Sequence, residues 1–143
     1  MKRRILLVDD DLPVLLTLKA LLELHDFEVE TATTTPEALA RMESGVFHLV
    51  ISDLRMDTED AGFKVIRAAH RQSYDPATAL LTAYPSEEES GLDATADSLL
   101  VKPLGTRDLL RQVEALLIRH EDAKQARLRL SNNGGHESAR KAG

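Results

Sequence analysis

Short apolar runs alternate with segments whose apolar residues recur at helical spacing, and this alternation constrains the fold more than any other feature of the chain. The runs predict five buried strands, at residues 4–8, 27–32, 48–52, 77–81 and 99–101. Strands that alternate with helices in this way favour a mostly parallel sheet with right-handed crossovers and helices on both faces. We therefore predict an α/β fold: a single three-layer (βα)5 domain around a five-stranded parallel sheet.

Capping residues mark the expected ends of the helices. Asp11 is placed to cap the first helix, and Thr35 to cap the second, which has Pro36 at its first position. A third helix is expected at residues 63–71, and Ser86 predicts the start of a short fourth one. Each predicted helix follows a predicted strand, as the parallel arrangement requires.

The character of the chain changes after about residue 120. The last helix, which begins at Thr106, is expected to extend past this point and to end at the Asn- and Gly-rich residues 131–135. The tail that follows has almost no apolar content and is expected to be disordered. We predict one folded domain at residues 1–120, and a helix extension with a disordered tail or linker at 121–143.

Acidic residues follow two of the predicted strands. Asp9 and Asp10 come directly after the first strand, and Asp53 follows the third. In the flavodoxin-like strand order 2-1-3-4-5 these two strands are neighbours, and ligands bind beyond their carboxyl ends. Gathered carboxylates repel one another unless a cation neutralises them, and oxygen ligands suit Mg²⁺. The sequence therefore predicts a divalent-cation site at this edge.

Two further polar signals end the fourth and fifth strands. Thr82 follows the fourth apolar run, and Lys102-Pro103 follows the fifth. An acid pair, a single Asp, a Thr and a Lys-Pro, each at a strand end and in this order, resemble the receiver domain of two-component response regulators. The resemblance covers roughly residues 2–120.

The resemblance implies that Asp53 accepts a phosphoryl group from a histidine kinase phosphohistidine. Asp9 and Asp10 would hold Mg²⁺, with Mn²⁺ as an alternative, together with Asp53 and the backbone carbonyl of Arg55. Such a domain assists only its own phosphorylation and dephosphorylation, so the resemblance implies a signalling domain and not an enzyme.

The resemblance also implies how the signal leaves the site. Thr82 and Lys102 would contact the phosphoryl oxygens, and Lys102-Pro103 is a candidate cis peptide. Thr82 and the residue at position 99 would form the switch. The expected partners are a sensor histidine kinase or phosphotransfer protein, an output domain or downstream protein on the helix 4–strand 5–helix 5 face, and a second copy in a homodimer.

The chain departs from the family pattern at two places. Leu99 stands where family members usually have Tyr or Phe, so the usual aromatic readout is missing. The loop after Asp53 carries added acids, with Asp57 in the usual place of Pro, and its Gly62 comes slightly later than the family glycine. These departures keep an alternative open, a receiver-fold interaction module that ignores phosphate.

A third hypothesis is a Mg²⁺-dependent phosphohydrolase with Asp53 as nucleophile, similar to haloacid-dehalogenase-like phosphatases. That family needs a second Asp two residues on, where this chain has Arg55. Turnover of a generic phosphomonoester would favour it.

Composition limits the partners. The 24 acids and 18 bases give a net charge of −6, which argues against a general nucleic-acid surface. No cysteine is present, so disulfides and thiolate metal sites are excluded. No apolar segment approaches the length of a membrane span, and we expect a cytoplasmic protein.

Overall fold

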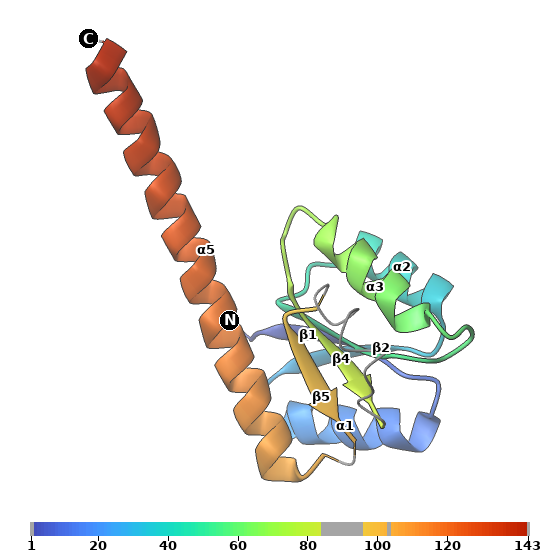
Figure 1. Ribbon diagram of the computed structural model, residues 1–143. Coiled ribbons are helices and arrows are strands. Elements are labelled where there is room, and N and C mark those ends of the chain that lie inside the picture. Colours follow the sequence, from blue (N-terminus) through green and yellow to red (C-terminus); the bar gives the residue numbers. More distant parts are fainter. Residues whose placement is uncertain (1, 84–95, 103, 143) are drawn as a thin grey trace.

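A computed structural model describes residues 2–83, 96–102 and 104–142, with side chains as far as Ser131. It contains one five-stranded sheet in which all neighbouring strands are parallel, in the order β2-β1-β3-β4-β5 (Figure 1). The strands are β1 (Arg4–Val8), β2 (Glu28–Ala32), β3 (Leu49–Asp53), β4 (Ala77–Thr82) and β5 (Ser98–Val101). The predicted α/β fold and strand order are confirmed.

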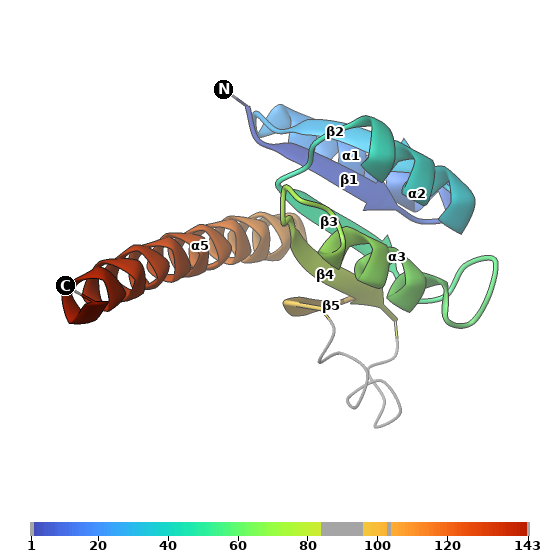
Figure 2. The same ribbon diagram turned by 90° about the horizontal axis from the view of Figure 1, so that it is seen from above.

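Helices cover both faces of the sheet. They are α1 (Leu12–Leu24), α2 (Thr35–Ser44), α3 (Ala61–His70) and α5 (Thr106–Ala142). α1 and α5 lie on one face, and α2 and α3 lie on the other (Figure 2). The helix expected to begin at Ser86 lies outside the described residues.

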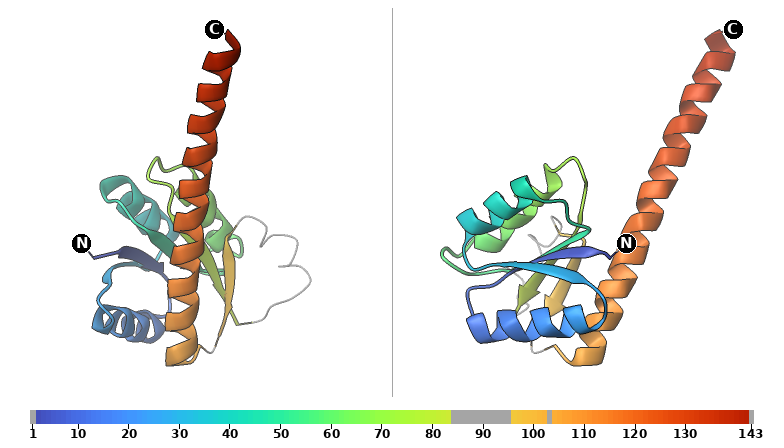
Figure 3. Two further views of the ribbon diagram at one scale, coloured as in Figure 1. Left: turned by 90° about the vertical axis from the view of Figure 1, so that its left-hand side faces the viewer. Right: turned by 180° about the vertical axis from the view of Figure 1, so that it is seen from behind.

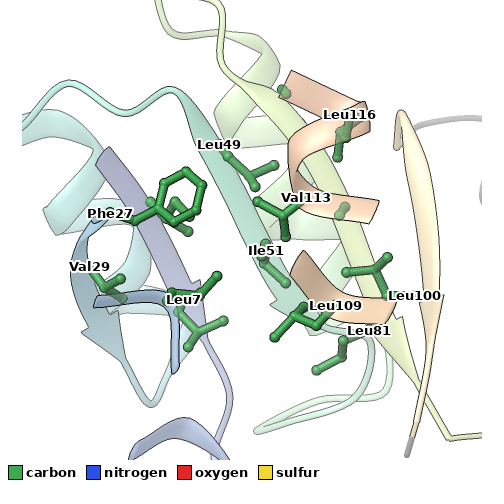
Figure 4. Packing of buried hydrophobic residues seen from close by; sticks show 14 of the residues in the cluster. Leu7, Phe27, Val29, Leu49, Ile51, Leu81, Leu100, Leu109, Val113 and Leu116 are labelled. Carbon is green, nitrogen blue, oxygen red and sulfur yellow. The ribbon is translucent and has the colours of Figure 1, made fainter. Parts of the chain in front are cut away.

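Successive side chains of β1 point to opposite faces, so the strand contributes to a core on each side. Ile5 and Leu7 belong to the cluster under α1 and α5, and Leu6 and Val8 to the cluster under α2 and α3. Figure 4 shows the first cluster, in which strand residues meet α5 through Leu109, Val113 and Leu116. A strand buried on both faces reads as a continuous apolar run, which is why the pattern located it.

The helix starts agree with the capping signals to within one residue. The Asp11 side chain accepts a hydrogen bond from the Val14 amide at 3.3 Å, as predicted. The cap of α2 is Thr34 and not Thr35, because the Thr34 hydroxyl accepts from the Glu37 amide at 3.2 Å. Thr35 is instead the first helical residue.

α5 is longer than predicted. It continues to Ala142 and extends well beyond the rest of the domain (Figure 3). The expected stop at residues 131–135 is therefore wrong for this structure. An established helix propagates without a new nucleation step, and each glycine costs only about 1 kcal/mol. The division between a domain at 1–120 and a disordered tail stays a prediction.

Candidate functional site

The aspartates predicted to converge lie together at the carboxyl edge of the sheet. β1 and β3 are neighbours, with Val8 opposite Ser52, so the residues that follow them are adjacent. Asp9, Asp10 and Asp53 each offer one carboxylate oxygen, and these oxygens all lie within 4.8 Å of one another. Three hard oxygen donors at this spacing fit a small divalent cation.

Asp9 is the fully buried member of the cluster, and both of its carboxylate oxygens have partners. Its Oδ1 accepts a hydrogen bond from the Asp11 amide at 3.0 Å. Its Oδ2 accepts one from Lys102 Nζ at 3.2 Å. A buried charge is costly unless it is paired and hydrogen-bonded, and these contacts satisfy that requirement. Asp10, by contrast, is exposed.

Lys102 connects the end of β5 to the aspartates. Its Nζ lies 3.4 Å from Asp53 Oδ1, in addition to the contact with Asp9. Its backbone amide donates to the Thr82 carbonyl at 2.7 Å, which holds the residue beside the end of β4. Partial burial alone would lower the pKa of Lys102, but the carboxylates of Asp53 and Asp9 raise it above the usual value. The side chain therefore carries a full positive charge at neutral pH.

Asp53 has an unusual protonation equilibrium. Burial raises the pKa of its carboxyl, the negative charge of Asp9 raises it further, and Lys102 opposes both, leaving the pKa at about 6 in the cation-free protein. The carboxylate is consequently held in a site that disfavours its charge, and a bound cation would relieve this cost.

Thr82 ends β4 next to the aspartates. It is only 4% exposed, and β4 lies beside β3 with Leu81 opposite Asp53. On its other side it pairs with Val101, directly before Lys102. The strand register thus brings all five sequence-predicted side chains to one edge. Pro103 lies outside the described residues, so its predicted cis peptide stays a prediction.

The loop between β3 and α3 passes close to Asp53, and Gly62 allows this approach. The Gly62 amide donates to the Leu54 carbonyl at 2.9 Å. A Cβ atom at position 62 would lie 2.6 Å from the carbonyl oxygen of Asp53 and 2.7 Å from Leu54 Cα. The sequence showed only that Gly62 comes slightly later than the glycine of the family pattern, and did not indicate this close contact. This contact depends on the path of an irregular loop, which residue spacing does not reveal.

The same loop contacts α2 through Asp57, which is not part of the candidate metal cluster. Thr35 Oγ1 donates to Asp57 Oδ1 at 2.9 Å. Arg55 lies in the exposed part of this loop, two residues after Asp53. Among the described residues, the candidate cation cluster contains Asp9, Asp10 and Asp53 but neither Asp57 nor Asp60.

Leu99 lies on the side of the sheet that faces α3. It is partly buried and packs against the cluster formed by Leu54, Phe63, Ile66 and Leu80. Leu80 is its partner on β4. An aliphatic side chain therefore occupies the place that the family pattern gives to an aromatic ring.

A family model described as the response regulator receiver domain matches residues 5–114. This chain belongs to that family. It is 37% identical over 118 residues to the transcriptional regulatory protein PrrA of Mycobacterium tuberculosis, an alignment covering 81% of this chain and 50% of PrrA. The chain thus spans about half the length of the curated relatives it matches.

Solved structures agree with this assignment. A CheY-like receiver domain protein from Methanospirillum hungatei JF-1 is 34% identical, with a TM-score of 0.77 and coverage of 86% of this chain and 99% of that one. The response regulator TrrA from Thermotoga maritima, solved in complex with Mg(2+)-BeF, is 34% identical with a TM-score of 0.71, covering 80% and 98%. In the part of the chain that the structure describes, no helix has the length and apolar character needed to cross a membrane.

Proposed function

We propose that Asp53 is the phosphoacceptor of this receiver domain. A carboxylate oxygen of Asp53 attacks the phosphorus of a phosphohistidine and the N–P bond breaks. The ring nitrogen that carried the phosphoryl group takes up a proton from solvent, and the neutral imidazole leaves. The product is an aspartyl phosphate on the chain itself, so the domain acts as a phosphoacceptor and not as an enzyme with a separate substrate. The observation that carries the proposal is that the Lys102 ammonium lies 3.4 Å from the Asp53 carboxylate and 3.2 Å from the buried carboxylate of Asp9.

The donor set favours a resident Mg²⁺, with Mn²⁺ as the alternative. Asp9, Asp10, Asp53 and the backbone carbonyl of Arg55 would hold it, since all four offer hard oxygen ligands. When bound, the cation offsets the negative charge of the carboxylates and of the incoming phosphoryl oxygens. Burial and the charge of Asp9 raise the pKa of Asp53, and Lys102 opposes this rise only in part, which supports a role for a further cation.

Lys102 and Thr82 act on the phosphoryl group once it is attached. Phosphoryl transfer depends mainly on positioning and on charge neutralisation. Lys102 supplies a point charge suited to phosphate, and the distance of 3.4 Å between its Nζ and Asp53 Oδ1 supports this role. The Thr82 hydroxyl then donates a hydrogen bond to a phosphoryl oxygen. With Leu99, it forms the switch, because the local charge change biases β4 and β5, the strands that carry these two residues.

The apolar surface near the site favours a protein as the phosphodonor over a small molecule. Leu12 and Leu16 of α1 are 53% and 52% exposed beside the acidic edge. An apolar groove of about 690 Å³ lies between α1 and the carboxyl ends of β4 and β5, and is lined by Val14, Leu81 and Leu104 together with Lys102. We propose a sensor histidine kinase or phosphotransfer protein as the donor. An output domain, a downstream protein or a second copy of the chain would receive the signal. We also propose that the protein is cytoplasmic.

Incubation with acetyl phosphate and Mg²⁺, followed by intact-mass measurement, tests the proposal. We expect the gain of one phosphoryl group, lost with a chelator and in Asp53→Asn. Asp57→Asn is the matched control, because Asp57 lies four residues further on and outside the cation cluster, and it should still be phosphorylated. Labelling that persists in Asp53→Asn would assign the phosphoryl group to another residue and contradict the proposal. No labelling of the parent chain would favour the phosphate-independent interaction module.

A further inference from the structure

α5 contacts the domain beyond its apolar core through three polar side chains. The His120 ring nitrogen Nε2 lies 2.9 Å from the carbonyl oxygen of Asp75. Lys124 Nζ donates to the Tyr74 carbonyl at 3.2 Å, and Arg127 donates to Asp75 Oδ2 at 2.9 Å. We call the contact of His120, Lys124 and Arg127 with Tyr74 and Asp75 the α5 clasp.

The clasp continues the buried face of the helix. His120 follows Val113 and Leu116 at helical spacing, and Lys124 and Arg127 follow in steps of four and three residues. Val113 and Leu116 are 1% and 3% exposed against the sheet, so the same face turns from apolar to polar where α5 passes the end of the core. The packing of Val113 and Leu116 on the sheet therefore turns this face of α5, with its three polar side chains, toward the domain.

The receiving loop is fixed by its own contacts. The Tyr74 hydroxyl donates a hydrogen bond to the Met42 carbonyl at 2.9 Å. The Tyr74 ring packs edge-on against that of Phe47, with the ring centroids 6.4 Å apart. Asp75 has a positive φ of 46°, in the left-handed region that a non-glycine residue seldom adopts. Both Arg127 and His120 contact Asp75 in this conformation.

His120 also lies close to Asp97, the residue directly before β5. Its Nδ1 lies 3.8 Å from Asp97 Oδ2. The same Asp97 oxygen accepts hydrogen bonds from the Thr78 amide at 2.8 Å and from the Thr78 hydroxyl at 3.1 Å. Asp97 directly precedes β5, and Asp75 lies two residues before β4. One imidazole therefore lies between the amino ends of the two strands whose carboxyl ends carry Lys102 and Thr82.

We propose that the clasp couples the part of α5 beyond residue 117 to the relative position of β4 and β5. β5 has four residues, so Lys102 and Asp97 are joined by a rigid segment of roughly 16 Å. Phosphorylation of Asp53 would draw Lys102 and Thr82 toward the phosphoryl group, and the strands would carry that change to Asp97 and Asp75. This coupling step rests on the proposed function, whereas the clasp itself does not.

Amide exchange of the full chain tests both parts. Without any phosphate mimic, His120→Ala should raise exchange in residues 118–131 several-fold. Arg129→Ala, an exposed position two residues from Arg127, is the matched control and should leave exchange unchanged. His120→Gln keeps a side-chain N–H near the Asp75 carbonyl and should restore most of the protection. Equal exchange in the parent chain and His120→Ala would overturn the clasp.

Beryllofluoride with Mg²⁺ tests the coupling. We expect it to change exchange in residues 118–131 of the parent chain and to have little effect there in His120→Ala. Because coupling is reciprocal, His120→Ala should also change the affinity for the mimic. A response around Asp53 without one in residues 118–131 would overturn the coupling. Absence of any response around Asp53 would instead count against the proposed function, and the mimic-free comparison would still decide the clasp.

Discussion

The ammonium of Lys102 lies 3.4 Å from the Asp53 carboxylate and 3.2 Å from that of Asp9. One ammonium directly after β5 thus contacts two carboxylates, that of Asp53 at the end of β3 and that of Asp9 directly after β1. In the cation-free protein this contact limits the rise in the pKa of Asp53, whose carboxyl is already shifted upward by burial and by Asp9. Lys102 therefore both stabilises the resting site and lies where a phosphoryl oxygen would arrive.

Replacing this ammonium should impair phosphorylation more than folding. We expect Lys102→Ala to lower the rate of phosphoryl incorporation from acetyl phosphate by about 100-fold, as for loss of one group that stabilises developing charge. Time-resolved intact mass measures the rate. Lys64→Ala, which removes an exposed lysine paired with Asp60, is the control and should retain the parent rate. Comparable rates in Lys102→Ala and the parent would remove Lys102 from the proposed machinery.

The raised pKa of Asp53 predicts a pH-dependent stability. Between the unfolded value of 3.8 and the folded value of about 6, the folded chain binds more protons than the unfolded chain. The free energy of unfolding should therefore fall as pH rises through this window. Asp53→Asn should remove that slope and stabilise the chelator-treated protein above about pH 7 by about 1–2 kcal/mol.

Urea unfolding in the presence of a chelator, at about pH 4 and about pH 8, measures both quantities. Asp57→Asn controls for the loss of one negative charge from the same loop. Excess Mg²⁺ should reduce the advantage of Asp53→Asn, because cation binding stabilises only the chain that retains the ligand. A mutant no more stable than the parent at the higher pH would contradict the burial argument.

The sequence was most informative where a local pattern has a single structural outcome. Strands such as β1, buried on both faces, appear as uninterrupted apolar runs, and the Asp11 cap follows from a short-range preference. The edge containing Asp9, Asp53 and Lys102 could be predicted because the sheet order converts strand ends into neighbours.

Other features depend on contacts that no local pattern encodes. None of the five histidines has metal-ligand spacing, and sequence analysis therefore gave His120 no role. Its partner Asp75 is 45 residues away, and only the folded chain brings them together. Thr34 and Thr35 are chemically equivalent as caps, so the choice between them depends on where the backbone leaves β2.

Gly62 should be essential because a side chain there would collide with the backbone of Asp53, the proposed phosphoacceptor. An added Cβ would lie 2.6 Å from the Asp53 carbonyl oxygen. This oxygen is a backbone atom, so it cannot move aside as the end of a flexible side chain could. We expect Gly62→Ala to lower the free energy of unfolding by about 2 kcal/mol or more, in the range for overpacking of a closely packed site. It should also slow phosphorylation, since the shift reaches Asp53.

Gly105→Ala is the matched control for Gly62. Its added Cβ would meet only the Asp108 side chain, at 3.7 Å, an ordinary van der Waals distance. Urea unfolding and intact-mass labelling of the two variants separate backbone collision from a general effect of replacing glycine. A Gly62→Ala protein with parent stability and parent labelling rate would show that the loop adjusts at little cost.

Replacing Leu99, three residues before Lys102, tests whether this position serves packing or phosphoryl chemistry. Its side chain is half-buried against Leu80 and Ile66, so Leu99→Ala should lower the free energy of unfolding by about 1–2 kcal/mol, less than for a fully buried leucine. The rate of phosphoryl incorporation should stay within about two-fold of the parent, because contacts of Leu99 lie in the apolar cluster and not with the carboxylates. Leu130→Ala, at a position 71% exposed, controls for leucine truncation and should alter neither quantity. A large loss of labelling in Leu99→Ala without loss of stability would instead place Leu99 in the phosphoryl-transfer machinery.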